Sequence, residues 1–435
     1  MSPRFARARA LALDITPLRE SVAYRALWLG QLVSQFGTNM RVVAVAYQVF
    51  QITHSTVAVG FVGVVELVPL IVFGLIGGAI ADRRDRRMLS AQAQVGLMAS
   101  SGALVVITLA GDPSVVWIYI LLAVSSAFAA IDRPARSAMV PSLVPPGTLP
   151  AAMALRQVVF QVTQIVGPAL GGVLIAALPV HGGGSPGVAI IYFIDAATYI
   201  AGLVSLRWVP TMMPEVEGEP QASLQSVREG LAFAVKRPVI LSIFLVDLVA
   251  MMFGMPRAVF PALAERTFHG GAGILGLLYA APAIGALISA LTTGWVGRIR
   301  RQGLAVILSV VAWGVAITLA GLTLFSLALT VIFLAIAGGA DVVSAVFRGT
   351  MLQDATPDAL RGRLNALNIM VVTGGPRLGD FEAGLVAGAF GATASIITGG
   401  LACVIGTGIL SGVVPAFRKY HLPVPNDRVE SDPGA

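Results

Sequence analysis

Long apolar runs separated by short polar segments occupy almost the whole chain. A helix that crosses a bilayer needs about 20 apolar residues. Runs of that length predict helices over residues 24–50, 56–81, 88–110, 115–138, 152–178, 187–208, 238–262, 270–296, 303–323, 326–352, 364–389 and 392–416. The pattern therefore predicts an all-α membrane protein with twelve transmembrane helices.

The composition indicates that lipid is the main solvent of this chain. Of its 435 residues, 56% are hydrophobic and 12% are charged, whereas a soluble domain is about 25% charged. The single cysteine, Cys403, lies in an apolar run, so we expect neither a disulfide framework nor a cysteine-based metal site. No cofactor and no bound metal are expected.

Basic residues are concentrated in alternate loops. The loops 82–87, 297–303 and 360–363 are rich in arginine, and most of the loops between them carry no lysine or arginine. Basic loops stay in the cytoplasm, so both termini are expected there, and we interpret the first residues as a tail rather than a signal peptide. The net charge of +7 is therefore a topology signal and not a nucleic-acid site.

The longest polar stretch divides the chain into two similar halves. We expect a cytoplasmic tail at 1–22, a six-helix bundle at 23–208, a cytoplasmic linker at 209–237, a second six-helix bundle at 238–417 and a cytoplasmic tail at 418–435. An offset of 212 residues aligns Arg136 with Arg348, and an offset of 216 aligns Arg41 with Arg257. Repeated halves are common in secondary transporters, whose substrate sites lie near the bilayer midplane.

The loop "GGAIADRRDRRML" resembles the signature G-x-x-x-D-R-x-G-R-R of the major facilitator superfamily. Its positions are filled by Gly78, Asp82, Arg83, Arg86 and Arg87. Asp85 stands where a glycine is usual. The resemblance implies the two-bundle major facilitator fold, in which the loop aspartate faces a helix N-terminus and helps to latch the halves.

The stretch "QIVGPALGGVLI" resembles a motif that marks proton-coupled exporters of that superfamily. Its core is Gly167, Pro168, Gly171 and Gly172, but Thr163 replaces an earlier glycine of the motif. Close helix packing alone also explains such glycines.

Three further segments resemble the branch of enterobactin exporters and drug–proton antiporters. They are "DRPARSAMVPSLVPPGTLPAAMAL", "LGLLYAAPAIGALISALTTG" and "TMLQDATPDALRGRLNALN", and the similarity extends from about residue 20 to residue 417. The resemblance implies export of a small organic molecule, either a siderophore or a drug.

The segment "GGPRLGDFEAG" holds three charges inside an apolar region. Arg377 and Asp380 share a face of the predicted helix, since they are about 60° apart around it, whereas Glu382 points nearly the opposite way. We expect the preceding Gly374–Pro376 to break or kink the helix at a water-accessible hinge. The charges then bind substrate or carry protons; the alternative is an internal Arg–Asp pair that fixes this helix.

Other ionisable residues within the apolar runs are retained at a cost of about 3 kcal/mol each. Candidates for proton or substrate handling are Asp341, Asp247, Glu66, Arg41 and Arg257, the last two being either an ion-paired gate or an attractor of anionic cargo. Near the cytoplasmic ends, four residues are expected to snorkel or to form inner-gate bonds, namely Asp132, Arg133, Arg136 and Arg348.

The sequence thus predicts a monomeric proton-coupled exporter in a bacterial inner membrane, with protons, a small molecule and lipid as its partners. An importer or a lipid flippase of the same fold is the alternative. A membrane enzyme and an ATP-driven pump are disfavoured, because the histidines are scattered and no phosphate-binding G-x-x-x-x-G-K occurs. A receptor is disfavoured because no sizeable soluble domain exists.

Overall fold

The protein was examined as a computed structural model. It describes residues 14–81, 84–111, 113–178, 185–213, 224–292, 296, 299–357 and 360–422. Within these ranges the chain is helical and contains no strand. Asp82 and Arg83 of the signature loop lie outside the described residues, as do the first 13 residues.

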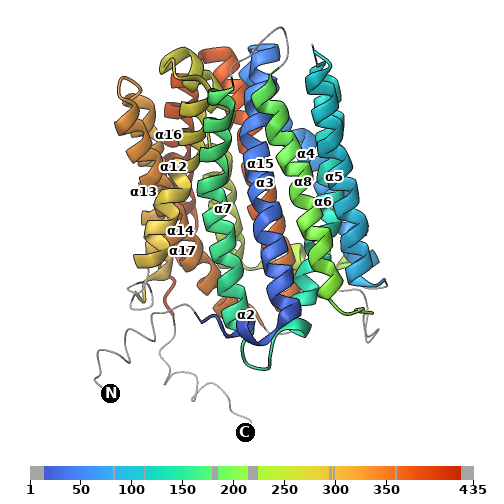
Figure 1. Cartoon of the computed structure of the whole chain (residues 1–435). Helices are drawn as coiled ribbons and strands as arrows, with labels where there is room; N and C mark the ends of the chain where they lie inside the picture. The colour runs from blue at the N-terminus through green and yellow to red at the C-terminus, as the bar shows by residue number, and fades with distance from the viewer. Residues whose placement is uncertain are drawn as a thin grey trace, which may run out of the picture. The chain divides into compact units, whose positions relative to one another are not determined.

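The first half of the chain forms long helices joined by short loops (Figure 1). They are α2 (Thr16–Glu20), α3 (Val22–Thr53), α4 (Thr56–Ala81), α5 (Arg86–Leu109), α6 (Val115–Leu143), α7 (Leu149–Ala177) and α8 (Pro186–Ser205), followed by the 3₁₀ turn η1 (Leu206–Trp208).

The second half begins with the short amphipathic helix α9 (Leu224–Lys236). It continues with α10 (Pro238–Phe253), η2 (Arg257–Val259), α11 (Phe260–Ala262), η3 (Leu263–Thr267), α12 (Gly271–Thr292), α13 (Gln302–Leu322), α14 (Leu327–Ala355), α15 (Arg361–Phe390), α16 (Ala392–Val413) and α17 (Pro415–Arg418).

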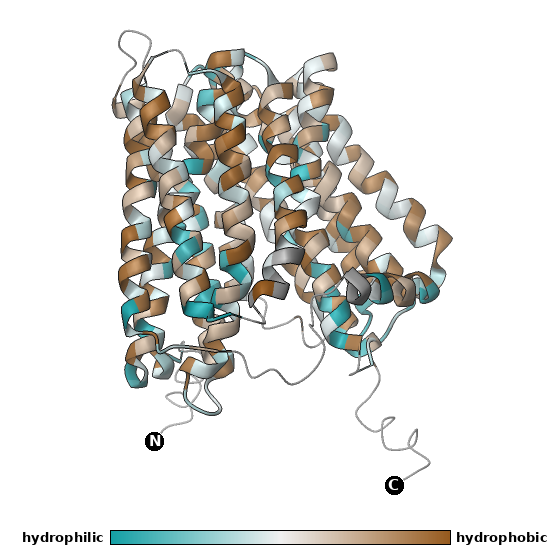
Figure 2. Ribbon diagram, turned by 90° about the vertical axis from the view of Figure 1, so that its right-hand side faces the viewer, coloured by the Kyte–Doolittle hydropathy of each residue, from teal (hydrophilic) through white to brown (hydrophobic). Residues whose placement is uncertain are grey.

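The predicted spans correspond to observed helical segments. In the described part of the chain, ten segments are long and apolar enough to cross a membrane, with Pro238–Thr267 counted as one. The long helices α3 and α15 fall short of that threshold, and α15 contains the charges of "GGPRLGDFEAG". Hydrophobic residues extend along most of the length of the long helices (Figure 2). Large side chains such as Phe325 and Leu291 are 82% and 79% exposed, as expected for lipid-facing positions.

The span predicted over 238–262 corresponds to the candidate membrane span Pro238–Thr267, but it is not one regular α-helix. Helix α10 ends at Phe253, and the chain continues as a 3₁₀ turn, a single α-turn and a π-turn. Pro256 has no N–H to donate and disfavours helical backbone at the residue before it. The indole of Trp313 donates to the Gly254 carbonyl at 3.0 Å, which satisfies an acceptor that the break leaves free.

Of the break or kink expected at Gly374–Pro376, the break is wrong. Helix α15 runs unbroken from Arg361 to Phe390 and contains Pro376. A Cβ at Gly375 would meet Met251 at 2.8 Å, and one at Gly379 would meet the Met252 carbonyl at 2.8 Å. The glycines of this segment therefore let α10 and α15 approach closely, as small residues do in membrane proteins.

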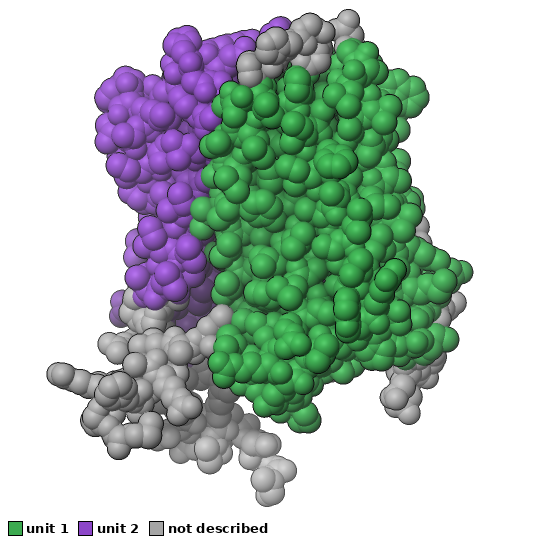
Figure 3. All heavy atoms as spheres, viewed as in Figure 1, with its two compact units in different colours: residues 1–52, 68–220 green, residues 53–67, 221–435 purple. Residues whose placement is uncertain are grey.

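Two compact units are distinguished by their internal contacts (Figure 3). Unit 1 contains residues 1–52 and 68–220, and unit 2 contains residues 53–67 and 221–435. The division at 220 falls in the expected linker, but the first part of α4 groups with unit 2. The domain bounds of the sequence analysis remain predictions.

Each unit is built on close helix pairs. In unit 1, α5 packs against α6 and α8, and α3 runs beside α8, where Gly37 leaves room for the backbone of Asp195. In unit 2, α14 packs against α12 and α13, and α10 packs against α15 and α16. These pairs hold the charged side chains described next.

Candidate substrate and proton sites

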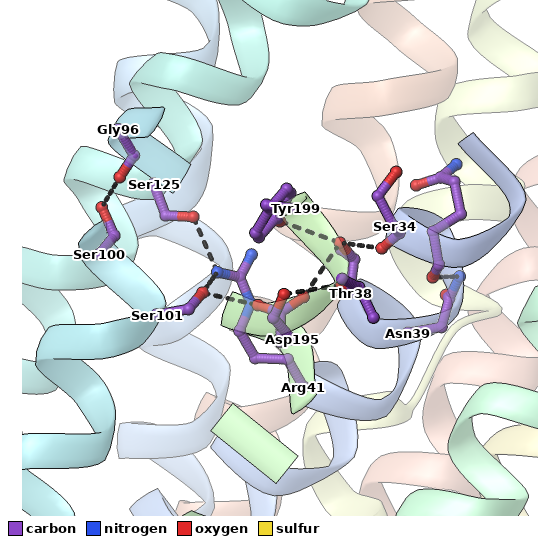
Figure 4. A network of polar contacts seen from close by, with 12 residues as sticks. Ser34, Thr38, Asn39, Arg41, Gly96, Ser100, Ser101, Ser125, Asp195 and Tyr199 are labelled. Carbon is purple, nitrogen blue, oxygen red and sulfur yellow. Dashed lines mark hydrogen bonds and ion pairs between the residues drawn. The ribbon is translucent and has the colours of Figure 1, made fainter. Parts of the chain in front are cut away.

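A buried ion pair joins α3 to α8 in unit 1 (Figure 4). Arg41 Nε lies 3.4 Å from Asp195 Oδ2, and Asp195 is fully buried. Arg41 Nη1 also donates to the hydroxyls of Ser101 at 3.2 Å and Ser125 at 2.9 Å, and Ser101 donates to Asp195 at 2.6 Å. The helices α3, α5, α6 and α8 therefore meet at this pair.

This network satisfies its own buried polar groups. Thr38 donates to the second carboxylate oxygen of Asp195 at 3.4 Å and lies 3.1 Å from the hydroxyl of Tyr199. Of these side chains, none has a buried polar atom without a hydrogen-bond partner. Of the two interpretations left open for Arg41, the geometry agrees with the ion pair. Asp195 and the two serines were not candidates, and only the intramembrane position of Asp195 marked it in the sequence.

A second pair lies in α6 near its C-terminal end. Arg136 Nε is 2.8 Å from Asp132 Oδ2, one helical turn away, and Ser90 donates to the same carboxylate. Arg136 is only 7% exposed, so the snorkelling interpretation is wrong for this residue. Arg136 can remain buried because the nearby carboxylate of Asp132 neutralises its guanidinium. The neighbouring Arg133 is exposed.

The described part of the signature loop is held by Asp85. Its carboxylate accepts from the Arg87 N–H at 3.0 Å, which caps α5, and from the Met212 N–H at 3.2 Å. The Arg86 N–H donates to the Met212 carbonyl, and the Arg86 side chain donates to Ala138 O at 3.2 Å. The aspartate that replaces the usual glycine therefore ties the loop to the segment after α8.

The glycine motif of α7 packs against α3. The helix continues through Pro168. A Cβ at Gly167 would meet Asn39 at 2.6 Å, and one at Gly171 would meet the Met40 carbonyl at 3.2 Å. Gly172 is also buried. The motif provides close helix packing here, and its association with exporters stays a prediction.

In unit 2, Arg348 lies between two carboxylates. Its Nη1 is 2.8 Å from Asp247 Oδ1, and its Nη2 is 3.8 Å from Asp341 Oδ1. The snorkelling interpretation is wrong for Arg348 as well, because its side chain is only 6% exposed. Arg348 was expected at the inner gate, and Asp247 and Asp341 were expected to handle protons or substrate. In the structure, the three side chains form one group.

A second charged group lies on α15 and the first part of α4. Arg377 Nη2 is 3.2 Å from Glu66 Oε2, and Arg377 Nη1 donates to the Thr373 carbonyl at 2.8 Å. Within the described part of the chain, no ion pair joins Arg377 to Asp380. The alternative of an Arg–Asp pair within α15 is therefore not observed. Arg377 pairs between helices, because Gly63 lets α4 reach the backbone at Arg377.

Asp380 faces the break after α10. The backbone N–H of Ala258 is directed at its carboxylate, and Arg257 and Arg377 both act on its charge. In a continuous helix that N–H would donate to the Gly254 carbonyl. The break therefore supplies a free donor to Asp380. Glu382 is half-buried and forms no ion pair with another described residue.

A cavity of about 280 Å³ lies at the junction of α4, η3, α15 and α16 in unit 2. Its lining includes Thr56, Thr267, Gly388 and Arg266, whose guanidinium donates to the His54 carbonyl at 2.8 Å. The described residues contain no cluster of histidine, cysteine or carboxylate side chains that would hold a metal ion.

Comparisons with known proteins agree with a transport role. A model of the transmembrane secretion effector family of the major facilitator type matches residues 12–425. An enterobactin exporter of Citrobacter koseri is 30% identical over 413 residues, which cover 95% of this chain and 97% of the relative. One of Shigella boydii is 32% identical over 355 residues, which cover 82% and 83%.

Solved transporters share the fold. A bacterial homologue of the iron transporter ferroportin matches with a TM-score of 0.66 and 16% identity, covering 88% of this chain and 98% of that one. The peptide transporter POT matches with a TM-score of 0.71 and 13% identity, covering 92% and 96%. The family match and the enterobactin exporters, together with the apolar helices, indicate a multi-pass inner-membrane protein of a transporter family.

Proposed function

The chain belongs to the transmembrane secretion effector family of the major facilitator superfamily, and from this premise we propose that it is a proton-driven exporter. It crosses the inner membrane twelve times as two six-helix bundles with both termini in the cytoplasm. It works as a monomer surrounded by lipid and moves its cargo outward by alternating access.

One observation supports proton coupling most strongly. Unit 2 holds buried charged groups whose polar atoms lack hydrogen-bond partners, among them Asp341 Oδ1, Asp380 Oδ1 and Arg377 Nε. Such atoms are costly in an apolar layer unless water, a proton or a ligand meets them during the working cycle. In contrast, the Arg41–Asp195 network of unit 1 is fully hydrogen-bonded, so we assign it a structural role.

The cargo is a small organic molecule, either a siderophore or a drug. The named relatives export enterobactin, which favours a siderophore. The charged candidates in unit 2 include both signs, such as Arg257 and Arg377 beside Asp380 and Glu382, and this mixture does not choose between an anionic and a cationic cargo. Import, or lipid flipping by the same fold, is the alternative, and the direction of proton movement distinguishes it.

Proton flux in proteoliposomes tests this proposal. The purified protein is reconstituted with a pH-sensitive dye inside, a proton gradient is imposed, and siderophores and several drug classes are added in turn. We expect one class to drive proton movement, and Asp380→Asn to reduce it at least tenfold, because the variant removes the carboxylate that faces Ala258. Glu382→Gln tests the other face of α15.

Two outcomes contradict the proposal. If a cargo binds but moves no protons, the protein is a uniporter, and the carboxylates are structural. If Asp380→Asn and Glu382→Gln both transport protons like the unaltered protein at equal expression, α15 lies outside the coupling path.

A further inference from the structure

The charges around Arg348 do not balance. Its guanidinium contacts Asp247 at 2.8 Å and Asp341 at 3.8 Å, and we call these three side chains the Arg348 triad. One guanidinium neutralises one carboxylate. The triad therefore carries one surplus negative charge when both aspartates are ionised, and such a charge is costly in the apolar layer.

The two carboxylates are not equivalent. Asp247 makes the shorter contact, and its side chain is 3% exposed, whereas the side chain of Asp341 is 23% exposed. Asp247 is therefore the better partner for the arginine. Asp341 is held more loosely and is less covered by protein.

An unpartnered hydroxyl lies on the same face of α14. Ser344 follows Asp341 by three residues and precedes Arg348 by four, so the three side chains share one helix face. Ser344 is fully buried, and its hydroxyl has no hydrogen-bond partner. The Oδ1 atom of Asp341 also lacks a hydrogen-bond partner and lies 3.8 Å from the guanidinium. The face is therefore prepared for a polar species that comes and goes.

Among the described residues, one further cation, Arg257, acts on Asp341, and it is shared with Asp380. Helix α13, which packs against α14, carries no titratable side chain, α12 carries only Tyr279, and α10 carries only Asp247. The positive charge of Arg257 attracts the carboxylate of Asp341. Cys403 of α16 is close enough to Arg348 to interact with its charge. Arg257 also acts on Asp380, so it does not belong to the triad alone.

We propose that the Arg348 triad holds one exchangeable proton and that Asp341 carries it. This assignment rests on the proposed proton-driven export and names the carboxyl group that takes part. On uptake, an O–H bond forms at Asp341 and leaves Asp247 paired with Arg348; on release, the proton passes to water. A sodium ion is disfavoured, because the guanidinium contacts both carboxylates and repels a second cation.

Infrared spectroscopy of the full-length protein in nanodiscs tests the charge count. With carboxyl-labelled aspartate, the band of a protonated aspartic acid is followed while the pH is raised. In an Asp380→Asn background, which removes the other unpartnered aspartate of unit 2, we expect one titrating band and its loss when Asp341→Asn is added. It should also be lost in Asp247→Asn, because Arg348 is then free to neutralise Asp341. In Arg348→Gln the band should roughly double, since both carboxyl groups lose their cation.

Asp354→Asn is the matched control, because Asp354 lies on the same helix and is hydrogen-bonded to Tyr420 at 2.7 Å, away from the triad. The control should keep the band. Survival of the band in Asp341→Asn overturns the assignment, as does a band that responds to sodium at constant pH. Asp341→Asn leaves the closer Asp247–Arg348 pair in place, so we expect this variant to fold.

The measurement uses neither cargo nor a gradient, and it is therefore independent of the flux assay. If the band behaves as expected and no compound moves protons, the proposed export fails while the proton site stands. If the flux assay succeeds and the band is unchanged in Asp341→Asn, the site lies elsewhere.

Discussion

At the scale of single residues, the buried Arg41–Asp195 pair is sensitive to the loss of either partner. Removing one partner of a buried pair leaves an uncompensated charge, which costs about 3–5 kcal/mol. We expect Arg41→Met and Asp195→Asn each to lower the thermal stability and yield of the purified protein. The double variant should recover part of the loss, because no lone charge remains. Thermal unfolding in detergent measures this.

The exposed Arg207 supplies the control for that prediction. It lies in η1, and Arg207→Met should change the stability by about 0.5 kcal/mol or less. If the Arg41 and Asp195 variants are as stable as Arg207→Met, the pair is not a structural one, and a role in transport has to be considered for it.

The charged residues were recognisable from the sequence, but their partners were not. Arg348 and Asp341 were both marked by their position in an apolar run, yet Asp247 lies on a different helix, and only packing brings it to 2.8 Å. In the same way, Arg377 was expected beside Asp380, three residues away, and pairs instead with Glu66. Local periodicity predicts which side chains share a helix face. It does not predict which other helix packs against that face.

At the scale of elements, glycine decides how closely α10 and α15 pack. A Cβ at Gly379 would collide with the backbone carbonyls of Met251 and Met252, which cannot move aside. We expect Gly379→Ala to lower stability and transport strongly. Gly408→Ala in α16 is the matched change, because a Cβ there meets nothing within 4 Å. It should be neutral or gain up to about 1 kcal/mol from helix propensity.

Thermal unfolding and cargo flux of both variants test this prediction. Equal behaviour of Gly379→Ala and Gly408→Ala would mean that α10 and α15 separate without cost.

Helix positions were predictable because the apolar runs have the length of a bilayer, whereas the place of the helix break was not. A break or kink was expected at Gly374–Pro376, and the break is found at Gly254–Pro256. Both segments contain glycine and proline, and the interrupted one is Gly254–Pro256, whose freed groups find Trp313 and Asp380. In α15, Pro376 is tolerated inside an unbroken helix. Whether a proline breaks a helix depends on partners for the freed backbone groups, and these come from distant parts of the chain.

At the scale of the whole molecule, the arginine-rich loops make the topology testable. The only cysteine, Cys403, is fully buried, so the unaltered protein should not react with a membrane-impermeant maleimide. Maleimide labelling of a variant with one added cysteine therefore reports on that cysteine alone. Ser114 lies before α6 in a loop without basic residues, and Arg300 lies before α13 in a basic loop; both are exposed.

Basic loops remain on the cytoplasmic side because arginine resists translocation. In intact cells we therefore expect Ser114→Cys to be labelled and Arg300→Cys to stay unlabelled, and both to react once the membrane is permeabilised. If only Arg300→Cys were labelled in intact cells, every helix would have the orientation opposite to the one expected. An exporter that releases cargo on the side of Ser114 would then become an importer, and the same inward proton flow would have to be coupled in the opposite sense.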